Sequence, residues 1–410
     1  MRLLFVLPSF PFPPADGGRA KIFNILRYLS VRHKCDLICF GDIDRADVAG
    51  LRQHIPSIGE VWIVSPPSWI ARIFRTLTNL ILLRPPSLVR YSSPEMLKRI
   101  DAIKQTGSYD AIHFDIINMA PYHRNCRDIP SIHSPNDATS LVYRRLSENV
   151  TSLTLGLRLR AASLLLARYE RKHYADFSKI HVVSEIDRDY LASVAPKASV
   201  TVVPITSGYT QGVSALYPRK EQSGAPIITV CGNLGDPAIA VGFREFMRLV
   251  LPVVSGAYPA LRVRVLGRRI SASLKRELKE HSQIEYLAWV DSFEDFLSAS
   301  DVLLLPDSAG APGAKTRTVQ AMALGRAVLG SAIAFEGIPI VNRRHGAVYR
   351  THEECCDLLM LLLGNSEMRK ELGAAAARLA ADEYSLERIG PQYEAMYLQV
   401  VRCHDSLKAI

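Results

Sequence analysis

The hydrophobic positions of the chain fall into short apolar runs that alternate with longer segments of helical spacing. In residues 21–31, for example, apolar side chains recur three and four positions apart, as on one face of a helix. Most of the short runs are predominantly apolar, which is typical of strands buried on both faces of a parallel sheet. They lie at residues 3–7, 35–40, 61–64, 111–114, 180–183, 227–231, 262–266, 302–305 and 327–329. The alternation predicts an α/β fold with parallel sheets covered by helices.

The alternation stops near residue 204 and begins again at residue 227. Gly, Ser, Thr, Pro and a charged cluster fill residues 205–226, which is the composition of a linker. A chain of 410 residues also exceeds the usual size of one compact core. We therefore predict Rossmann-like domains at residues 1–205 and 226–385, a linker at 206–225 and a final helix within 386–410. Ligands of such sheets bind at the carboxyl ends of the strands, so we expect the two sheets to face each other across a cleft.

The composition places the chain among soluble globular proteins. Apolar residues make up 48% of the chain and charged residues 22%, as in a typical enzyme. No window has about 18 uncharged apolar residues in a row, so a membrane-spanning helix is not expected. The first residues carry one charge and no small-residue cleavage site, which favours a buried strand over a signal peptide. The seven cysteines show neither metal-ligand nor disulfide spacing, which indicates a reducing cytoplasm.

The net charge of +10 indicates an anionic partner. Nucleic acid is not expected, because the chain lacks zinc-ligand spacing, an aromatic-basic RNA motif and a basic tail. Phosphorylated substrates and an anionic membrane surface remain. Residues 69–84 and 155–171 mix apolar side chains with arginines, as basic amphipathic helices in peripheral contact with a membrane do. The same pattern suits helices that pack their apolar faces on a core and leave the arginines in water, so both interpretations stay open.

The richest candidate site spans residues 307–338. The apolar run at 302–305 leads into a loop of small residues, and an apolar helix begins near Lys315 and Arg317. The first turn of a helix has unpaired N–H groups and a partial positive charge, so it is an anion site. A Lys and an Arg added there suit a diphosphate better than a single carboxylate. The alternative is an ordinary strand-loop-helix crossover with two solvated cations.

Five segments, taken in order, resemble a known family. They are residues 11–37, 181–191, 229–237, 263–269 and 313–338. Together they resemble glycosyltransferases of the two-Rossmann-domain (GT-B) architecture, in the large retaining family four, and are most similar to bacterial sugar transferases of exopolysaccharide gene clusters. The resemblance covers nearly the whole chain, and it rests on the order and spacing of the segments rather than on one motif.

The resemblance implies transfer of a sugar from a nucleotide-sugar to a hydroxyl of a lipid-linked or saccharide acceptor. The anomeric configuration is then retained, the reaction takes place at the inner membrane face, and the C-terminal helix crosses back to the N-terminal domain. Such an enzyme mainly stabilises the departing diphosphate, and Lys315 and Arg317 match the family's basic positions for this task. We expect no metal and no other cofactor, since the sequence shows no carboxylate cluster that suits one.

The resemblance also assigns the donor site and shows two departures from the family. Gln320 stands where the family has a ribose-binding Glu, and an amide does not accept both hydroxyl protons as a carboxylate does. Residues 232–236 lack the Arg and Lys with which many relatives hold the phosphates. These departures leave a second hypothesis open, a catalytically weak or non-catalytic subunit that binds without turnover. The expected donor contacts are Gly232, Asn233, Arg268, Gly313, Gln320 and Glu336.

The N-terminal half offers two candidates for contacts with the acceptor or the sugar. Gly17, Gly18 and Arg19 follow the first strand and are expected to bind a phosphate or sugar, although a tight turn alone would also need glycine. His133 opens the loop-like segment 133–137, and we predict that it contacts the sugar or the reacting hydroxyl. A lone histidine is more often structural. A nucleotide-sugar epimerase is a weaker hypothesis, because no paired acids suit it.

Overall fold

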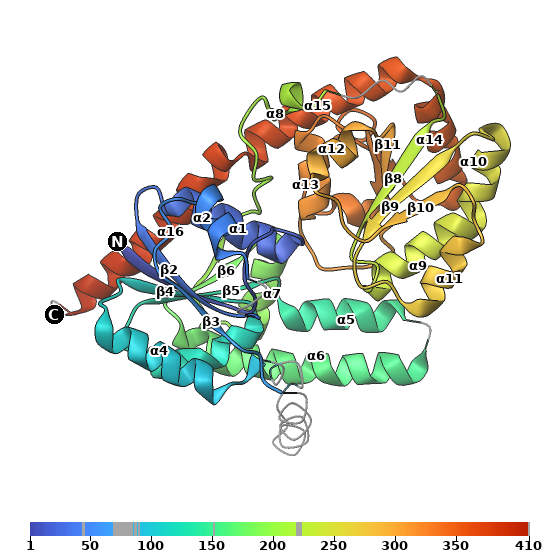
Figure 1. Cartoon of the computed structure of the whole chain (residues 1–410). Helices are drawn as coiled ribbons and strands as arrows, with labels where there is room; N and C mark the ends of the chain where they lie inside the picture. The colour runs from blue at the N-terminus through green and yellow to red at the C-terminus, as the bar shows by residue number, and fades with distance from the viewer. Residues whose placement is uncertain are drawn as a thin grey trace. The chain divides into compact units, whose positions relative to one another are not determined.

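The chain divides into two compact units. The computed structural model describes residues 1–42, 46–68, 85, 88, 91–150, 152–218 and 224–408. Unit 1 comprises Met1–Pro204 together with Ile389–Ile410, and unit 2 comprises Ile205–Arg388. Each unit holds a parallel sheet with helices packed against it, which confirms the predicted pair of Rossmann-like sheets (Figure 1). The predicted domain limits at residues 205 and 386 lie close to this division.

Within the described residues, the sheet of unit 1 has seven parallel strands in the order β3-β2-β1-β4-β5-β6-β7. The central strand β1 pairs with β2 on one side and β4 on the other, so that Leu3 lies opposite both Cys35 and Ala111. The strands are β1 (Arg2–Leu7), β2 (Lys34–Phe40), β3 (Val61–Val64), β4 (Ala111–Asp115), β5 (Ser131–Asn136), β6 (Lys179–Val182) and β7 (Val200–Val202).

Alternate residues of β1 enter two different cores, because successive side chains of a strand point to opposite faces. Leu3 and Phe5 pack in the core that also holds α1 and α16, whereas Leu4 and Val6 pack in the core that holds α4 and η3. The helices and 3₁₀ segments are α1 (Gly17–Leu29), α2 (Val48–His54), α4 (Pro94–Thr106), η3 (Ile117–Asn125), α5 (Thr139–Asn149), α6 (Leu153–His173), η4 (Tyr174–Asp176), α7 (Glu185–Val194) and α16 (Leu386–Lys408).

The C-terminal helix α16 belongs to the core of unit 1. Tyr393 and Tyr397 are 1% and 0% exposed, and Tyr397 donates or accepts a 2.7 Å hydrogen bond with Nδ1 of the buried His113. Burying an aromatic ring of this size contributes about 1.5–3 kcal/mol. The last helix therefore packs against the sheet of unit 1, although unit 2 (Ile205–Arg388) lies between the two in the sequence.

The described part of unit 2 has a six-stranded parallel sheet in the order β10-β9-β8-β11-β12-β13. Its strands are β8 (Ile227–Gly232), β9 (Arg262–Gly267), β10 (Ile284–Leu287), β11 (Val302–Leu305), β12 (Val328–Ser331) and β13 (Ala347–Tyr349). The helical segments are α8 (Val213–Leu216), α9 (Pro237–Glu245), the π-helix η5 (Phe246–Val250), α10 (Leu251–Ala257), α11 (Ala272–Lys279), α12 (Phe293–Ser298), α13 (Thr316–Ala323), η6 (Ala332–Phe335), α14 (His352–Gly364) and α15 (Ser366–Tyr384).

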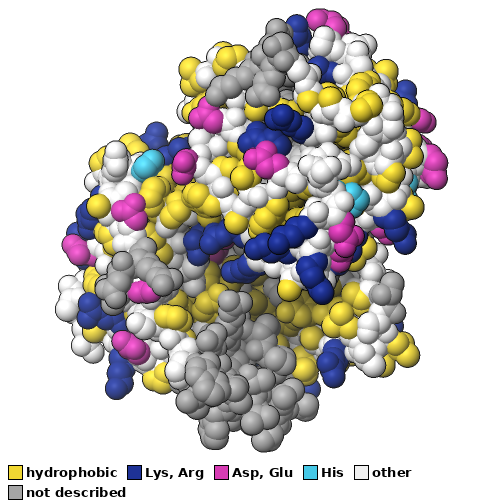
Figure 2. Space-filling view, turned by 45° about the vertical axis from the view of Figure 1, so that its right-hand side comes forward, with side chains coloured by type: hydrophobic (Ala, Val, Ile, Leu, Met, Phe, Trp, Pro, Cys, Tyr) yellow, Lys and Arg dark blue, Asp and Glu magenta, His cyan; other side chains and the backbone are white. Residues whose placement is uncertain are grey.

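The structure describes one of the two segments that were predicted to form amphipathic helices. Residues 69–84 lie outside the described residues. Residues 155–171 form most of α6, which carries exposed leucines at Leu153, Leu157 and Leu164 beside its arginines. One face of the molecule also gathers Lys and Arg side chains next to hydrophobic ones (Figure 2). None of the helices that the structure describes is long and apolar enough to cross a membrane.

Candidate functional site

The candidate donor site of unit 2 begins where β11 ends. Val302–Leu305 is fully buried, and the loop that follows leads to α13, which starts at Thr316. Lys315 precedes the helix in an extended conformation and forms no side-chain cap. Within the described structure, the N–H groups of Thr316 and Arg317 also have no hydrogen-bond acceptor. The first turn of α13 therefore keeps the free donors and the positive potential that an anion needs.

The side chain of Lys315 is engaged by its own loop. Its Nζ donates to the carbonyl oxygens of Ala311 and Gly313 at 2.6 and 2.7 Å. These two bonds close the small-residue loop onto the start of α13. Lys315 therefore lies at the position predicted from the sequence, but part of its hydrogen-bonding capacity shapes the loop.

Arg317 forms an ion pair with Asp307, a residue that the sequence patterns did not single out. Nη2 of Arg317 donates to Oδ2 of Asp307, whose side chain is 3% exposed. The other carboxylate oxygen, Oδ1, and Nε of Arg317 are buried, and neither has a hydrogen-bond partner among the described residues. A Cβ atom built on Gly232 would lie 3.7 Å from Cζ of Arg317, so the guanidinium lies beside the end of β8. Only its position directly after a buried strand could have identified Asp307 from the sequence.

The loops after β8 and β9 meet at the same edge of the sheet. A Cβ atom on Gly235 would lie 2.7 Å from the carbonyl oxygen of Arg269, which shows how closely the two loops approach. The exposed Asn233 orders its own loop, since its Oδ1 accepts a 3.3 Å bond from Gly235 N–H. Arg268 and Arg269 are exposed and form no ion pair with any residue the structure describes. The structure thus brings a third and a fourth cation to this edge.

Gln320 and Glu336 occupy different positions around the loop. Gln320 lies one turn after Arg317 on α13, is partly exposed, and has no side-chain hydrogen bond within the described structure. Glu336 follows η6 as its C-cap residue. The next residue, Gly337, has a φ of 78°, and a Cβ atom on it would lie 2.7 Å from Cα of Gly313. The turn at Gly337 therefore needs glycine for two reasons, its positive φ and its close contact with the backbone of the loop at Gly313.

In unit 1, the predicted glycine pair starts a helix at the end of β1. Gly17 and Gly18 form the first turn of α1, and Oδ1 of Asp16 caps it by accepting from Arg19 N–H at 3.0 Å. The Arg19 side chain is partly exposed and lies 3.7 Å from Asp16. The glycine pair and Arg19 therefore lie together at the carboxyl edge of this sheet, where ligands of α/β sheets bind.

A buried polar cluster lies one turn further along α1, and sequence reasoning missed it. Lys21 is 4% exposed and donates to Asp115 at 2.7 Å, to Ser134 at 2.9 Å and to Asn136. Burial is the largest single influence and would raise the pKa of Asp115, but Lys21 and His113 together outweigh it, and the pKa lies below its ordinary value. These contacts hold α1 to the ends of β4 and β5.

The expectation that His133 lies in a loop is wrong. Ser131–Asn136 is strand β5, and His133 is 0% exposed between Tyr174 and Phe177. Its Nδ1 bonds the carbonyl oxygen of Phe114 at 3.0 Å, and burial lowers its pKa to about 3. A neutral ring without exposed atoms does not reach a sugar, so its position supports a structural role.

The described residues contain no group of three or more His, Cys, Asp or Glu side chains placed to hold a metal ion. Lys315 and Arg317 lie at the start of α13, and Arg268 lies in the loop after β9. Cations beside the N–H groups of a first helical turn have the chemistry that suits an anion.

Residues 225–380 match the family model described as Glycosyl transferases group 1. No curated protein sequence matches the chain. The match confirms the predicted enzyme class at the level of this domain: unit 2 carries a glycosyltransferase group 1 domain.

Solved structures share the fold over nearly the whole chain. Sucrose-phosphate synthase from Thermosynechococcus elongatus is 15% identical with a TM-score of 0.72, covering 98% of this chain and 100% of that one. HepE of Anabaena in complex with UDP and glucose is 13% identical with a TM-score of 0.66, covering 97% and 100%. TarM of S. aureus is 10% identical with a TM-score of 0.69, covering 97% and 99%. The predicted GT-B fold class is confirmed.

Proposed function

We propose that this chain is a retaining glycosyltransferase that moves a sugar from a nucleotide-sugar to an acceptor hydroxyl. The observation that carries the proposal is the uncapped start of α13, with Lys315 and Arg317 beside it and the Gly232 backbone next to the guanidinium. Such a site stabilises the negative charge that develops on a departing diphosphate. HepE, one of the similar structures, was solved with UDP and with UDP-glucose, which supports a nucleotide-sugar donor.

In this proposal, Arg317 binds the diphosphate, and the ion pair with Asp307 keeps the Arg317 guanidinium oriented. A guanidinium has five N–H donors in a fixed plane, and the contact with Asp307 uses Nη2. Nε is buried, so the donors of Nη1 are the ones proposed to reach phosphate oxygens from a side chain that is 21% exposed. The two free N–H groups of the α13 first turn then add contacts that need no reorganisation. Gln320, one turn further along, is placed to reach the ribose.

The proposed acceptor is a lipid-linked or growing saccharide of exopolysaccharide synthesis, reached at the inner face of the membrane. The surface of α6 supports this part of the proposal. Leu153 and Leu157 are 78% and 60% exposed, and Arg158 and Arg160 follow on the same helix. Exposed leucines beside arginines favour contact with an anionic lipid surface. Gly17, Gly18 and Arg19 are the proposed acceptor contacts in unit 1.

The structure also offers a reason to keep the non-catalytic alternative. Both key cations already have internal partners, since Arg317 pairs with Asp307 and Lys315 binds two loop carbonyls. Compensated cations stabilise a diphosphate less than free ones do. A subunit of this kind binds a nucleotide-sugar and releases it unchanged.

Nucleotide binding and turnover separate these possibilities. We expect UDP, GDP or ADP to raise the melting temperature of the protein by mass action. The Arg317→Ala and Lys315→Ala variants are expected to weaken that binding roughly ten- to a hundredfold, the effect of losing a charged hydrogen bond. Arg276→Ala, which removes an exposed arginine of α11 in the same unit, is the control and is expected to bind as the parent does.

Three outcomes of the binding and turnover measurements are distinguishable. Equal binding by all three variants and the parent would show that the donor site lies elsewhere. Binding that depends on Arg317, with slow hydrolysis or transfer of the sugar from the matching nucleotide-sugar, supports the transferase. The same binding without release of the nucleotide under any acceptor condition would favour the non-catalytic subunit.

A further inference from the structure

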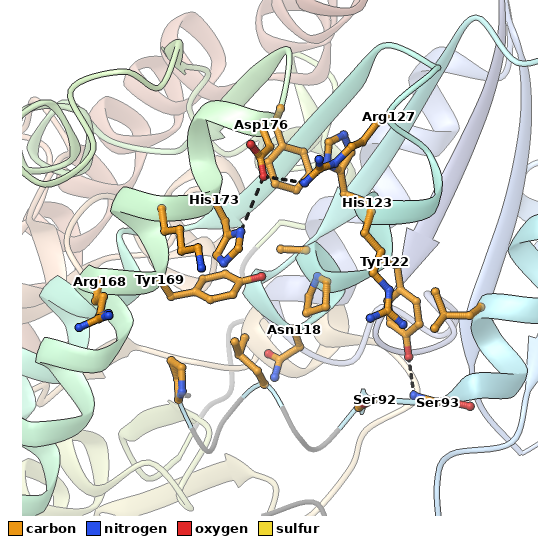
Figure 3. A pocket seen from close by; sticks show the side chains of 18 of the residues that line it. Ser92, Ser93, Asn118, Tyr122, His123, Arg127, Arg168, Tyr169, His173 and Asp176 are labelled. Atoms are coloured by element: carbon orange, nitrogen blue, oxygen red, sulfur yellow. Dashed lines mark hydrogen bonds and ion pairs between the residues drawn. The ribbon is translucent and has the colours of Figure 1, made fainter. Parts of the chain in front are cut away.

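A cationic pocket in unit 1 belongs to neither of the sites described above. Its volume is ≈ 610 Å³, and it lies between the start of α4, the 3₁₀ segment η3 and the C-terminal half of α6 (Figure 3). Gly17, Gly18 and Arg19 are not among its lining residues. The volume is within the range of sites that bind small organic ligands.

One face of α6 forms a wall of this pocket. Leu165, Arg168, Tyr169, Lys172 and His173 line it, at the spacing of three and four residues that places side chains on a single helix face. Figure 3 shows Tyr169 reaching into the pocket beside His173, with Asn118 and Tyr122 on the side opposite α6. The helix therefore presents a cationic and aromatic surface to the pocket, where Tyr169 and His173 are half-buried and Arg168 and Lys172 stay exposed to solvent.

The charges of the pocket are not balanced. Arg124, Arg168 and Lys172 line it, and none of them has a hydrogen bond or ion pair with another described residue. The lining includes one carboxylate, Asp176, which already accepts from Arg127 at 3.2 Å and lies 3.7 Å from His173. Cations gathered in a concave site with low-dielectric walls repel one another and attract an anion strongly.

The remaining lining has apolar side chains together with a few neutral polar ones. Leu97, Tyr122 and Leu165 are partly or fully buried there, and the ring centroids of Phe177 and His123 lie 4.2 Å apart with the ring planes tilted by 32°. A ligand that fills this space must bring apolar surface as well as negative charge. Arginines match the geometry of phosphate oxygens better than that of a monovalent ion.

We propose that this pocket binds a phosphate ester that carries an apolar group, through Arg124, Arg168 and Lys172. Phosphate oxygens neutralise the three cations, and the apolar group lies against Leu165, Tyr122 and Phe177. Either a lipid phosphate or a soluble phosphate ester has this chemistry. All the residues that line the pocket belong to unit 1, and none of them is part of the α13 donor site.

Calorimetry with short-chain probes tests the proposal. Dihexanoyl phosphatidic acid, kept below its micelle concentration, is expected to bind the full-length protein saturably with one site. The double variant Arg168→Gln, Lys172→Gln is expected to weaken this binding at least tenfold. The matched control, Lys98→Gln with Arg99→Gln, removes two exposed charges from α4 outside the pocket and is expected to change affinity less than twofold. UDP binding by the pocket variant, measured in parallel, is expected to equal that of the parent, so failure here leaves the donor site independently testable.

Further probes identify the source of the ligand. Glycerol 3-phosphate binding as tightly as the acyl form assigns a soluble phosphate ester, whereas preference for the acyl form assigns a lipid phosphate. Equal loss of affinity in the two double variants would overturn the proposal, because the attraction would then be a general effect of the positive surface charge of unit 1. Binding of dihexanoyl phosphatidylcholine as tight as that of phosphatidic acid, or no binding of any phosphate probe, would overturn it as well.

Discussion

Acid is expected to destabilise unit 1 because two of its histidines are buried in the neutral state. His133 and His181 are both 0% exposed, and burial is the main cause that lowers the pKa of each to about 3. An unfolded histidine has an ordinary pKa of 6.5. Because the folded pKa is the lower one, the unfolded chain binds more protons below pH 6.5. Stability is therefore complete above pH 6.5 and falls as the pH falls toward 3.

The size of the effect follows from the two pKa values. Between pH 7 and pH 5 the folded rings stay neutral while the unfolded rings take up protons, which lowers the free energy of unfolding by ~2 kcal/mol per ring. Glu170 raises the free energy of unfolding as the pH falls from 7 to 5, because burial raises the pKa of its carboxyl group to about 7 in the folded state. The plain pH dependence of stability therefore mixes effects of both signs, and a comparison between variants isolates one ring.

The informative variant is His133→Phe, which keeps an aromatic ring between Tyr174 and Phe177 and removes the titrating group. Urea unfolding at pH 7 and pH 5, followed by circular dichroism and by tryptophan fluorescence, gives the loss of unfolding free energy for each protein. We expect the loss in the variant to be ~2 kcal/mol smaller than in the parent. The control is His54→Phe at an exposed position, and we expect its loss of unfolding free energy between pH 7 and pH 5 to equal that of the parent. A loss in His133→Phe equal to that of the parent would refute the reasoning, whatever the stability of either protein at pH 7.

Three further predictions concern the structure around the two candidate sites. Lys21→Met leaves the buried Asp115 without its cation and is expected to lower the free energy of unfolding by about 3–5 kcal/mol. The double variant Lys21→Met, Asp115→Leu is expected to be less destabilised than the single variant, and urea unfolding of both proteins measures the difference. Gln320→Glu is expected to tighten UDP binding several-fold, because a carboxylate accepts from both ribose hydroxyls, and weaker binding by calorimetry would show that the pocket is built around the amide. Gly337→Ala is expected to displace the loop at Gly313 and weaken UDP binding, whereas Gly256→Ala, where a Cβ atom meets nothing within 4 Å, is expected to leave binding unchanged.

The strands that the sequence predicted are mostly apolar. β1, β2 and β11 lie within a residue of the predicted runs, because apolar residues dominate all three, with the buried Asp36 of β2 as the polar exception. β5 was missed, since Ser-Ile-His-Ser-Pro-Asn contains polar residues at buried positions. Those side chains are satisfied by partners far away in the sequence, as when His181 bonds Ser134 at 2.7 Å. A local hydrophobic pattern does not contain such long-range pairs.

The same limit applies to the candidate sites. The small-residue loop and the start of α13 were predictable, because strand, loop and helix signals follow one another directly in the sequence. The pairing of Arg317 with Asp307 was not, since the two residues are ten positions apart across an irregular loop and only the fold sets their distance. Lys21 and Asp115 are 94 residues apart and meet because β1 and β4 are neighbours in the sheet.

The internal contacts of the two cations determine how the proposed donor site has to work. Arg317 keeps unused donors while it pairs with Asp307, so it can bind phosphate without a change in the loop. Lys315 differs, because its ammonium has three donors and two already bind Ala311 and Gly313. If Lys315 moved fully to a phosphate, the loop would lose both bonds. If it keeps them, the first turn of α13 and Arg317 must supply most of the electrostatic stabilisation. Loss of thermal stability in ligand-free Lys315→Ala therefore measures the role of Lys315 in the loop, and its loss of UDP affinity beyond that of the control measures its role as a clamp.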